Sequence, residues 1–375
     1  MGKRELLLIV GFVILGAVVY QATAPAAGPD QRSTWATILD HVRREVRGNR
    51  SSVEITKTDT HPIAAATTEV RLALRSSDVT IVGEDRADIA SELEVWSNGY
   101  DDNEARSLAE QTVLKFSEAG GSAVFAIDYP DPGTQRATLT LRVPAHLRVH
   151  VARATQRQTI SGVAAVEAGE LRGETTIRQV PGRVTATHRS GDLVIEDVGQ
   201  LKLTLRGSDA RLERVRGDIM LQMQSGELRG SDLGGPIEIE SNGTEIALER
   251  LENTRGPIRV NASGGRVTLR GVGSETRIDS RNADVEIALG RPAPVTIYSE
   301  GEDVEVTPPP GGYTLDAIVT DGQFSAADAA IKVKAVEREQ RASADVRGGG
   351  AALTLRVTRG DVRLRARDET TDVER

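Results

Sequence analysis

Histidines are the residues of this sequence with the widest chemistry, because a neutral imidazole can bind a metal or act as a base. His146 and His150 are four positions apart. On a strand that even spacing places both rings on one face, but zinc needs further ligands and none follows at a recognisable spacing. His188 lies near Ser190 and Asp192, yet all three fall in one tight turn, whereas a hydrolase triad converges from separate segments. The sequence therefore predicts no enzyme and no catalytic, cofactor-binding or metal site.

Carboxylates recur at turns and would form a calcium-binding column if the turns were stacked. The spacing lacks the Gly-Gly-x-Gly-x-Asp pattern of calcium-binding β-rolls, and an Asp in a turn usually bonds its own backbone. We expect a structural role and no cofactor, with calcium as the alternative. The turn carboxylates are Asp192, Asp209, Glu227, Asp284 and Asp303.

The tripeptide Arg-Gly-Asp, an integrin-binding sequence, occurs twice, at residues 216–218 and 359–361. Both copies fall on turns of a repeated unit, and Gly and Asp are common turn residues. We interpret both copies as structural.

The elements that carry these turns repeat about every 18 residues from Gly182 to Val306. Each unit has the pattern of a strand, a turn and a second strand. In the second unit Leu201, Leu203 and Leu205 alternate with polar residues, so one strand face is aliphatic. A short fixed period indicates stacked supersecondary units. The units begin at Gly182, Gly199, Gly217, Gly235, Gly256 and Gly273, with spacings of 17, 18, 18, 21 and 17.

Two architectures fit this repeat. Neighbouring strands could pair as hairpins, and Asn242-Gly243 is a good hairpin turn. In the other architecture each unit is one coil, and equivalent strands stack in parallel. The nearly constant period, the glycines at both corners and the small inward aliphatics favour an all-β, single-domain β-solenoid, parallel β-helix-like, with about 18 residues per coil. The inward residues predicted for the third to fifth units are Ile219, Leu221, Met223, Leu228, Leu233, Ile237, Ile239, Ile246, Leu248, Leu251, Ile258, Val260, Ala262, Val267, Leu269 and Val272.

Composition narrows the class of protein. The 375 residues include no cysteine, which excludes disulfides, thiolate catalysis and lipidation of a cysteine. Aromatic residues make up 3% of the chain, which is low for a globular enzyme but natural for a slim aliphatic core. The net charge of −8 is spread along the chain without a basic stripe, so no nucleic-acid partner is expected.

The N-terminus carries a membrane signal. Lys3 and Arg4 precede an apolar run at 6–20, whose length lies between that of a signal peptide and that of a spanning helix. The basic residues should stay in the cytoplasm, which sends the rest of the chain outside. We expect residues 1–24 to be a retained transmembrane helix, with a cleaved signal peptide as the alternative. The protein would then be a single-pass protein of the cell membrane, with its main domain periplasmic or on the cell surface.

The rest of the chain divides into four segments. We expect the second of them to cover the first coil, because an open solenoid end is a sticky strand edge. The repeat departs from its pattern at 152–176 and in the unit of 21 residues, where a bulge fits. The segments are 25–51, a linker and an amphipathic helix; 52–151, a β-rich section with one helix at 104–116; 152–366, the β-strand-repeat solenoid; and 367–375, a disordered tail.

Three stretches are shared with a known family. They are Leu-Thr-Leu-Arg-Val-Pro-Ala at 139–145, the strand–Ser-Gly-Asp–strand unit at 184–198 and the closing Val-Thr-Arg-Gly-Asp-Val at 357–362. Over roughly 65–366 the chain resembles the bacterial family of putative adhesins of the DUF4097 β-strand-repeat type. The resemblance implies a β-solenoid exposed in the cell envelope, in a family without established catalytic residues. Some of its members are linked to envelope-stress sensing.

These observations favour a non-enzymatic, membrane-anchored scaffold of the cell envelope with a role in binding, adhesion or envelope sensing. Its polar flank would bind an envelope protein or polymer. The alternative is a self-assembling structural element of the envelope. A polysaccharide-active β-helix enzyme is less favoured, because its coils are usually longer and because sugar sites use exposed aromatics. Tyr298 and Tyr313 are among the few candidates here. The sequence identifies neither the partner nor the oligomeric state.

Overall fold

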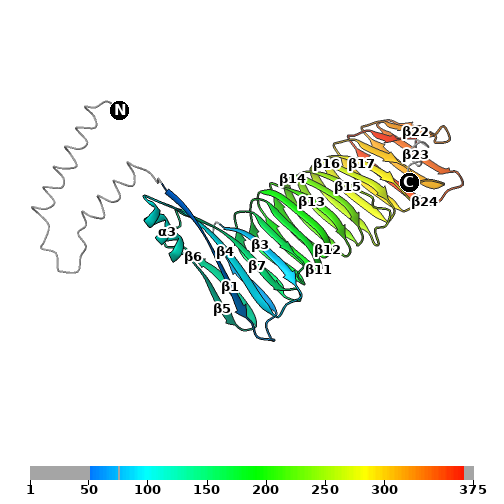
Figure 1. Cartoon of the computed structure of the whole chain (residues 1–375). Coiled ribbons are helices and arrows are strands. Elements are labelled where there is room, and N and C mark those ends of the chain that lie inside the picture. The colour runs from blue at the N-terminus through cyan, green and yellow to red at the C-terminus, as the bar shows by residue number, and fades with distance from the viewer. Residues whose placement is uncertain (1–50, 75–76, 367–375) are drawn as a thin grey trace, which may run out of the picture.

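The structure, a computed structural model, describes residues 51–74 and 77–366. These residues form almost only β-strands, as predicted, and the one helix among them is α3 (Asp102–Gln111). Figure 1 shows the strands stacked along one elongated body. No helix in the described ranges is long and apolar enough to cross a membrane. The predicted anchor at 1–24, the amphipathic helix before Ser51 and the tail at 367–375 lie outside the described residues.

Successive repeats pair in parallel, one unit apart in the sequence. Ile219 lies beside Ile237, and Ile237 lies beside Ile258, which are offsets of 18 and 21 residues. Asn242 pairs with Ser263 of the following unit, so the hairpin alternative is wrong for these repeats. The strands of this part are β8 (Arg148–Ala154), β9 (Gln158–Ser161), β10 (Ala165–Leu171), β11 (Thr175–His188), β12 (Gly191–Arg206), β13 (Ser208–Val215), β14 (Ile219–Leu233), β15 (Ile237–Glu249), β16 (Ile258–Val272) and β17 (Thr276–Leu289).

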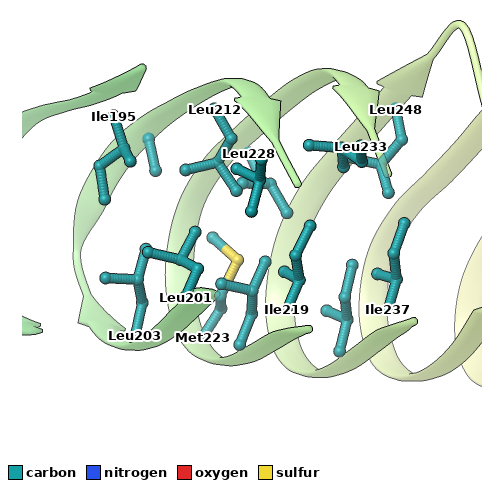
Figure 2. Close-up of a cluster of buried hydrophobic side chains, with 14 of the residues drawn as sticks. Ile195, Leu201, Leu203, Leu212, Ile219, Met223, Leu228, Leu233, Ile237 and Leu248 are labelled. Carbon is teal, nitrogen blue, oxygen red and sulfur yellow. The ribbon is translucent and has the colours of Figure 1, made fainter. Parts of the chain in front are cut away.

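Most long strands bend at a middle turn, so that their two halves belong to two layers facing each other across the core. In Figure 2, Leu203 and Ile219 lie on one side of the core, and Leu212 and Leu248 lie on the other. We call these the front layer and the back layer. The front layer comprises the paired segments 183–188, 200–206, 219–224, 237–242, 258–263, 276–281, 295–300 and 353–358. The back layer comprises 175–180, 191–198, 208–215, 226–233, 244–249, 265–272, 283–289 and 304–307.

Alternation of inward and outward side chains fills the space between the layers. In β14, Ile219, Leu221 and Met223 are buried, whereas Met220 and Gln222 between them are exposed. All the inward residues predicted from the alternation are buried, which confirms that part of the prediction. Full burial of one such side chain stabilises the fold by about 1.5–3 kcal/mol. The aliphatic interior is therefore the main source of stability for each coil.

The bends depend on residues with left-handed backbone conformation. At the bend after the back layer, Asp197, Arg214, Asp232 and Arg250 have φ of 54°, 53°, 56° and 55°. This conformation costs a non-glycine residue about 1–2 kcal/mol, so the pairing on either side must hold it in place.

The two irregular stretches fit into the stack, one through a longer connection between strands and one through a register shift. In the unit of 21 residues the extra length lies between β15 and β16, where Leu251 is buried and Thr254 Oγ1 donates a hydrogen bond to Leu233 O at 2.7 Å. The stretch at 152–176 contains β9 and β10 in parallel register, with a register shift between Ala168 and Glu170. One extra residue in a strand is thus absorbed by a bulge.

The N-terminal strands add antiparallel pairs to the start of both layers. β4 pairs with β1 and with β7, which joins the parallel back layer through β3. β5 and β6 form a hairpin at the start of the front layer. The helix α3 ends at Gln111, earlier than predicted, because residues 113–116 alternate as part of β5. The strands are β1 (Ser51–Pro62), β2 (Glu69–Ala73), β3 (Ser77–Glu84), β4 (Asp88–Gly99), β5 (Val113–Ala119), β6 (Ser122–Asp128) and β7 (Gln135–Pro144).

The C-terminal units do not follow the order of the sequence. β24 lies between β18 and β20 in the front layer, and β25 lies between β19 and β21 in the back layer. The last unit is therefore inserted between two earlier ones. β23 and β22 then close the front layer by antiparallel pairing. The strands are β18 (Val295–Glu300), β19 (Val304–Thr307), β20 (Tyr313–Thr320), β21 (Phe324–Ala326), β22 (Val333–Val336), β23 (Glu339–Val346), β24 (Ala351–Thr358) and β25 (Val362–Leu364).

Candidate binding groove

The two neighbouring histidines do not form a site. His150 lies on β8, and its Nδ1 is 3.8 Å from a carboxylate oxygen of Glu167. His146 is exposed in the preceding turn. Among the described residues, no three His, Asp or Glu side chains converge as metal ligands.

His188 is fully buried, and its partners differ from those of a triad. Its Nδ1 lies 2.9 Å from Ser208 Oγ, and its Nε2 lies 3.1 Å from the carbonyl oxygen of Gly173. Because a carbonyl only accepts, Nε2 carries the proton and Nδ1 accepts from the Ser208 hydroxyl. Burial lowers the pKa of His188. Ser190 and Asp192 are exposed on the turn, so the ring is a hydrogen-bonded core group of the corner.

Two of the five turn carboxylates accept hydrogen bonds from the backbone of the next strand in the stack. Asp209 Oδ1 accepts from the backbone N–H of Glu227, and Asp303 Oδ1 accepts from that of Asp361, both at 2.9 Å. For these two residues the expectation of bonds to their own backbone is wrong, because the neighbouring coil supplies the donor. Asp284 forms an ion pair with Arg266 at 3.3 Å. These contacts give Asp209, Asp284 and Asp303 structural partners within the stack.

Both Arg-Gly-Asp copies are tied into the stack. In the first, Arg216 is 3.5 Å from the Asp197 carboxylate, and Gly217 N donates to Gly199 O at 2.6 Å. In the second, Arg359 pairs with Glu300, and Asp361 Oδ1 accepts from Gln323 N at 2.9 Å. The side chains of Arg216, Arg359 and Asp361 therefore serve contacts between coils.

The outer surface of the back layer carries ion pairs between coils. Arg270 pairs with Glu286 at 3.2 Å, and Arg250 pairs with Asp232 at 2.7 Å. The Arg250 guanidinium lowers the pKa of Asp232. Exposed pairs contribute only about 0–1 kcal/mol each. Each of these pairs therefore adds little to the stability of the stack.

The front layer has a different outer surface, with a groove of about 830 Å³ that crosses seven strands. The strands are β12, β14, β15, β16, β17, β18 and β24. At about 4.8 Å per strand, six intervals give a length of about 29 Å. The groove therefore runs along the axis of the stack, across the strands.

Three rows of residues line the groove, and the members of each row share a register position. The middle row consists of Thr204, Gln222, Glu240, Asn261, Asp279, Tyr298 and Arg356. The corner row consists of Arg206, Gln224, Asn242, Ser263, Arg281, Glu300 and Thr358. The floor row, between the other two, consists of Leu205, Met223, Ser241, Ala262, Ser280 and Ser299.

The side chains of the floor row become smaller along the groove, from Leu205 and Met223 at one end to three serines and one alanine in the rest. Ser280 Oγ lies 2.9 Å from Ser299 Oγ. Ser241 Oγ, although buried, has no hydrogen-bond partner in the structure. Small side chains fill less of the interior than Leu or Met, so the wall can lie deeper at this row.

The charges of the groove balance, because the middle and corner rows together hold three arginines and three carboxylates. Most have partners. Asp279 accepts from Arg277 Nε at 2.7 Å and from Arg277 Nη2 at 3.0 Å, and Gln222 Nε2 donates to Glu240 at 3.2 Å. The remaining lining is amide and hydroxyl, so the groove is polar without a dominant charge.

Tyr298 is the aromatic member of the groove. Its side chain is exposed, and the guanidinium carbon of Arg277 lies 4.8 Å from the centre of its ring. The sequence marked Tyr298 and Tyr313 as rare candidates for exposed aromatics; the expectation is right for Tyr298 and wrong for Tyr313, which is buried in the core. The companions of Tyr298 could not be found from the sequence, because outward residues form rows only once the register is known.

Comparisons with known proteins return a faint likeness in shape. No family model matches the sequence, and no curated protein matches it either. The crystal structure of a putative cell adhesion protein from Clostridium sporogenes ATCC 15579 is 8% identical, with 84% of this chain and 100% of that chain covered and a TM-score of 0.21. The putative adhesin from Parabacteroides distasonis ATCC 8503 is also 8% identical, with coverage of 68% and 95% and a TM-score of 0.34. Neither likeness is close enough to identify a ligand for this chain.

Proposed function

We propose that this chain is a non-enzymatic binding scaffold, a β-solenoid that holds an extended partner in the groove of its front layer. The observation that supports this proposal is the set of side-chain rows that cross seven stacked strands. Each coil adds equivalent positions to the rows, so the site is long and shallow. A long surface of this kind suits a polymer better than a small substrate, which usually occupies a concave and mostly apolar pocket.

The same geometry favours binding over catalysis. Hydrolytic sites place a nucleophile, a base and an orienting group at one point. In the groove, successive side chains are instead separated by one strand spacing, about 4.8 Å. His188, the buried histidine of the corner, points into the core and bonds Ser208 there.

We further propose that the scaffold belongs to the cell envelope and is held at the membrane by residues 1–24. The support is the sequence, in which Lys3 and Arg4 precede an apolar run. A periplasm-only reporter fused after Arg375 should be active in this topology. An inactive reporter, in a fusion that is expressed and associated with the membrane, would overturn this topology.

Site-specific photo-cross-linking tests the groove itself. A benzophenone amino acid at Asn261, exposed in the middle row, should give adducts in native envelopes. The matched control places the same group at Thr268, on the outer surface of the same strand in the back layer. Adducts at Asn261 but not at Thr268 support the proposal. Equal yields, or no adduct at Asn261, would refute it.

A further inference from the structure

We infer that the ligand of the groove is a linear, uncharged polysaccharide chain that lies along the axis of the stack. This inference rests on the proposed function, because it names the class of polymer that the groove holds. Four observations support it: the direction of the groove, its donors and acceptors, its charge balance and its aromatic end.

The direction of the groove excludes main-chain recognition of a peptide strand. β15 is paired with β14 on one side and β16 on the other, and β17 with β16 and β18. An added peptide strand needs an unpaired sheet edge, whereas the groove crosses the middle of the layer. A ligand there meets side chains only.

The lining side chains suit a ligand rich in hydroxyl groups. Gln222, Gln224, Asn242 and Asn261 each present an amide oxygen and an amide NH2 group. A sugar hydroxyl both donates and accepts, so an amide can serve it in either direction. The rows repeat about every 4.8 Å, which is comparable to the length of one sugar ring in a linear chain. Equivalent hydroxyls of successive sugars can thus meet equivalent positions of successive coils.

The charge balance of the groove argues against a charged polymer. A polyanion would be favoured by a row of unpaired arginines, but Arg356 pairs with Asp316 at 2.5 Å, and the lining holds as many carboxylates as arginines. A polycation would in turn meet those arginines. The groove therefore selects against net charge of either sign.

Tyr298 supplies the apolar surface that carbohydrate sites need. The ring face opposite the Arg277 guanidinium can pack against the C–H face of a sugar, while the hydroxyl stays in water. The ring lies toward the C-terminal end of the groove, between Asp279 on β17 and Arg356 on β24. Stacking there would fix one sugar of the chain and set the register for the others.

Calorimetric titration of the purified full-length chain in detergent tests the inference. The neutral probes are cellohexaose, laminarihexaose, maltohexaose and chitohexaose, the anionic probe is hexagalacturonate, and the peptide probe is a Gly-Ser dodecapeptide. We expect at least one neutral hexasaccharide to bind, and to bind more tightly than its trisaccharide, because the longer chain meets more coils.

Two matched pairs of variants locate the binding. Asn261→Trp should weaken it about tenfold or more by filling the middle row, whereas Arg259→Trp, exposed on the same strand outside the groove, should not. Tyr298→Ala should weaken it about threefold to tenfold through loss of the ring, whereas Thr296→Ala on the same strand should not.

The outcomes separate the ligand class from the function. Binding of only the anionic or peptide probe overturns the inference, and so does neutral binding that Asn261→Trp leaves unchanged. If no probe binds but the Asn261 cross-linker still captures a partner, the carbohydrate assignment fails and the scaffold survives. If neither occurs, both fail.

Discussion

Stacking of the coils can be tested at one glycine, Gly265, in the middle turn of β16. Its φ is +90°, and a Cβ there would lie 2.1 Å from the carbonyl oxygen of Thr244 and 2.8 Å from its backbone nitrogen. These atoms belong to the preceding coil and are themselves held by strand pairing. Gly243 in the previous turn also has a left-handed φ, of +62°, but a Cβ there meets nothing within 4 Å.

Substitution of either glycine by alanine therefore places a side chain on a left-handed backbone, but only at Gly265 does the new Cβ also overlap the neighbouring coil. Gly243→Ala should cost at most about 1–2 kcal/mol for the left-handed backbone, partly offset by about 0.4–1 kcal/mol from a less flexible unfolded chain. Gly265→Ala adds an overlap with backbone that cannot move aside, and overpacking of that kind costs about 1–3 kcal/mol more. We expect Gly265→Ala to be the more destabilising change by that difference.

Urea unfolding followed by far-ultraviolet circular dichroism measures the midpoints of both variants. Because long repeat arrays can unfold in parts, hydrogen exchange of β15 and β16 amides should be measured as well. Gly265→Ala should lower the midpoint and increase exchange on both strands, while Gly243→Ala should change exchange little. Equal losses for the two variants would show that the coils do not approach each other as closely as the structure has them.

Three further predictions concern the core, pH and the N-terminal section. Ile239→Asp buries an unpaired carboxylate and should cost roughly 4 kcal/mol or more, whereas Glu240→Asp, exposed beside it, should stay within about 0.5 kcal/mol; similar urea midpoints for both would contradict the inward set. Burial lowers the pKa of His188 in the folded protein, so as the pH falls the unfolded chain binds a proton on this ring before the folded protein does. The contribution of His188 to the free energy of unfolding should therefore be constant above about pH 6.5 and should decrease as the pH falls toward the pKa of the folded state. His188→Gln should flatten that decline in melts between about pH 7 and 5, and an unchanged slope would exclude His188 as its cause. Lys57 Nζ donates to the carbonyl oxygens of Ala109, Glu110 and Thr112 at 3.0, 2.7 and 2.6 Å. Lys57→Met should therefore destabilise α3 by about 1–2 kcal/mol, which hydrogen exchange would detect as faster exchange of the α3 amides. Unchanged exchange would show that these bonds do not hold the helix.

The inward residues could be predicted from the sequence because burial alternates strictly along each strand. Leu221 and Ile239 follow that rule, and so does Leu251 in the irregular unit. The parallel stacking was favoured by the constant period, against the local signal of Asn242-Gly243. That dipeptide is a turn in the structure as well, but the strands on either side pair with other coils. The turn residues thus predicted where the chain bends, but not which strands pair with each other.

Other features had no local signal. The left-handed conformation of Arg214 and Arg250 could not be expected from residue type, because arginine has no preference for it. It is imposed by the stacking of one bend on the next. The partner of His188 was equally hidden, since Ser190 is closer in sequence than Ser208, which the next coil brings to the ring.

The end of the groove shows most clearly why a repeat in sequence does not determine a surface. If the units had stacked in chain order, β20 would lie beside β18, and its outward residue at this position, Ile318, would adjoin Tyr298. Instead β24 is inserted, and its register places Arg356 next to Tyr298, with Ile318 one strand further on. The insertion thus replaces an aliphatic neighbour by a guanidinium that pairs with Asp316. A binding row that runs across strands depends on such neighbours, so its chemistry at this end is a property of strand order.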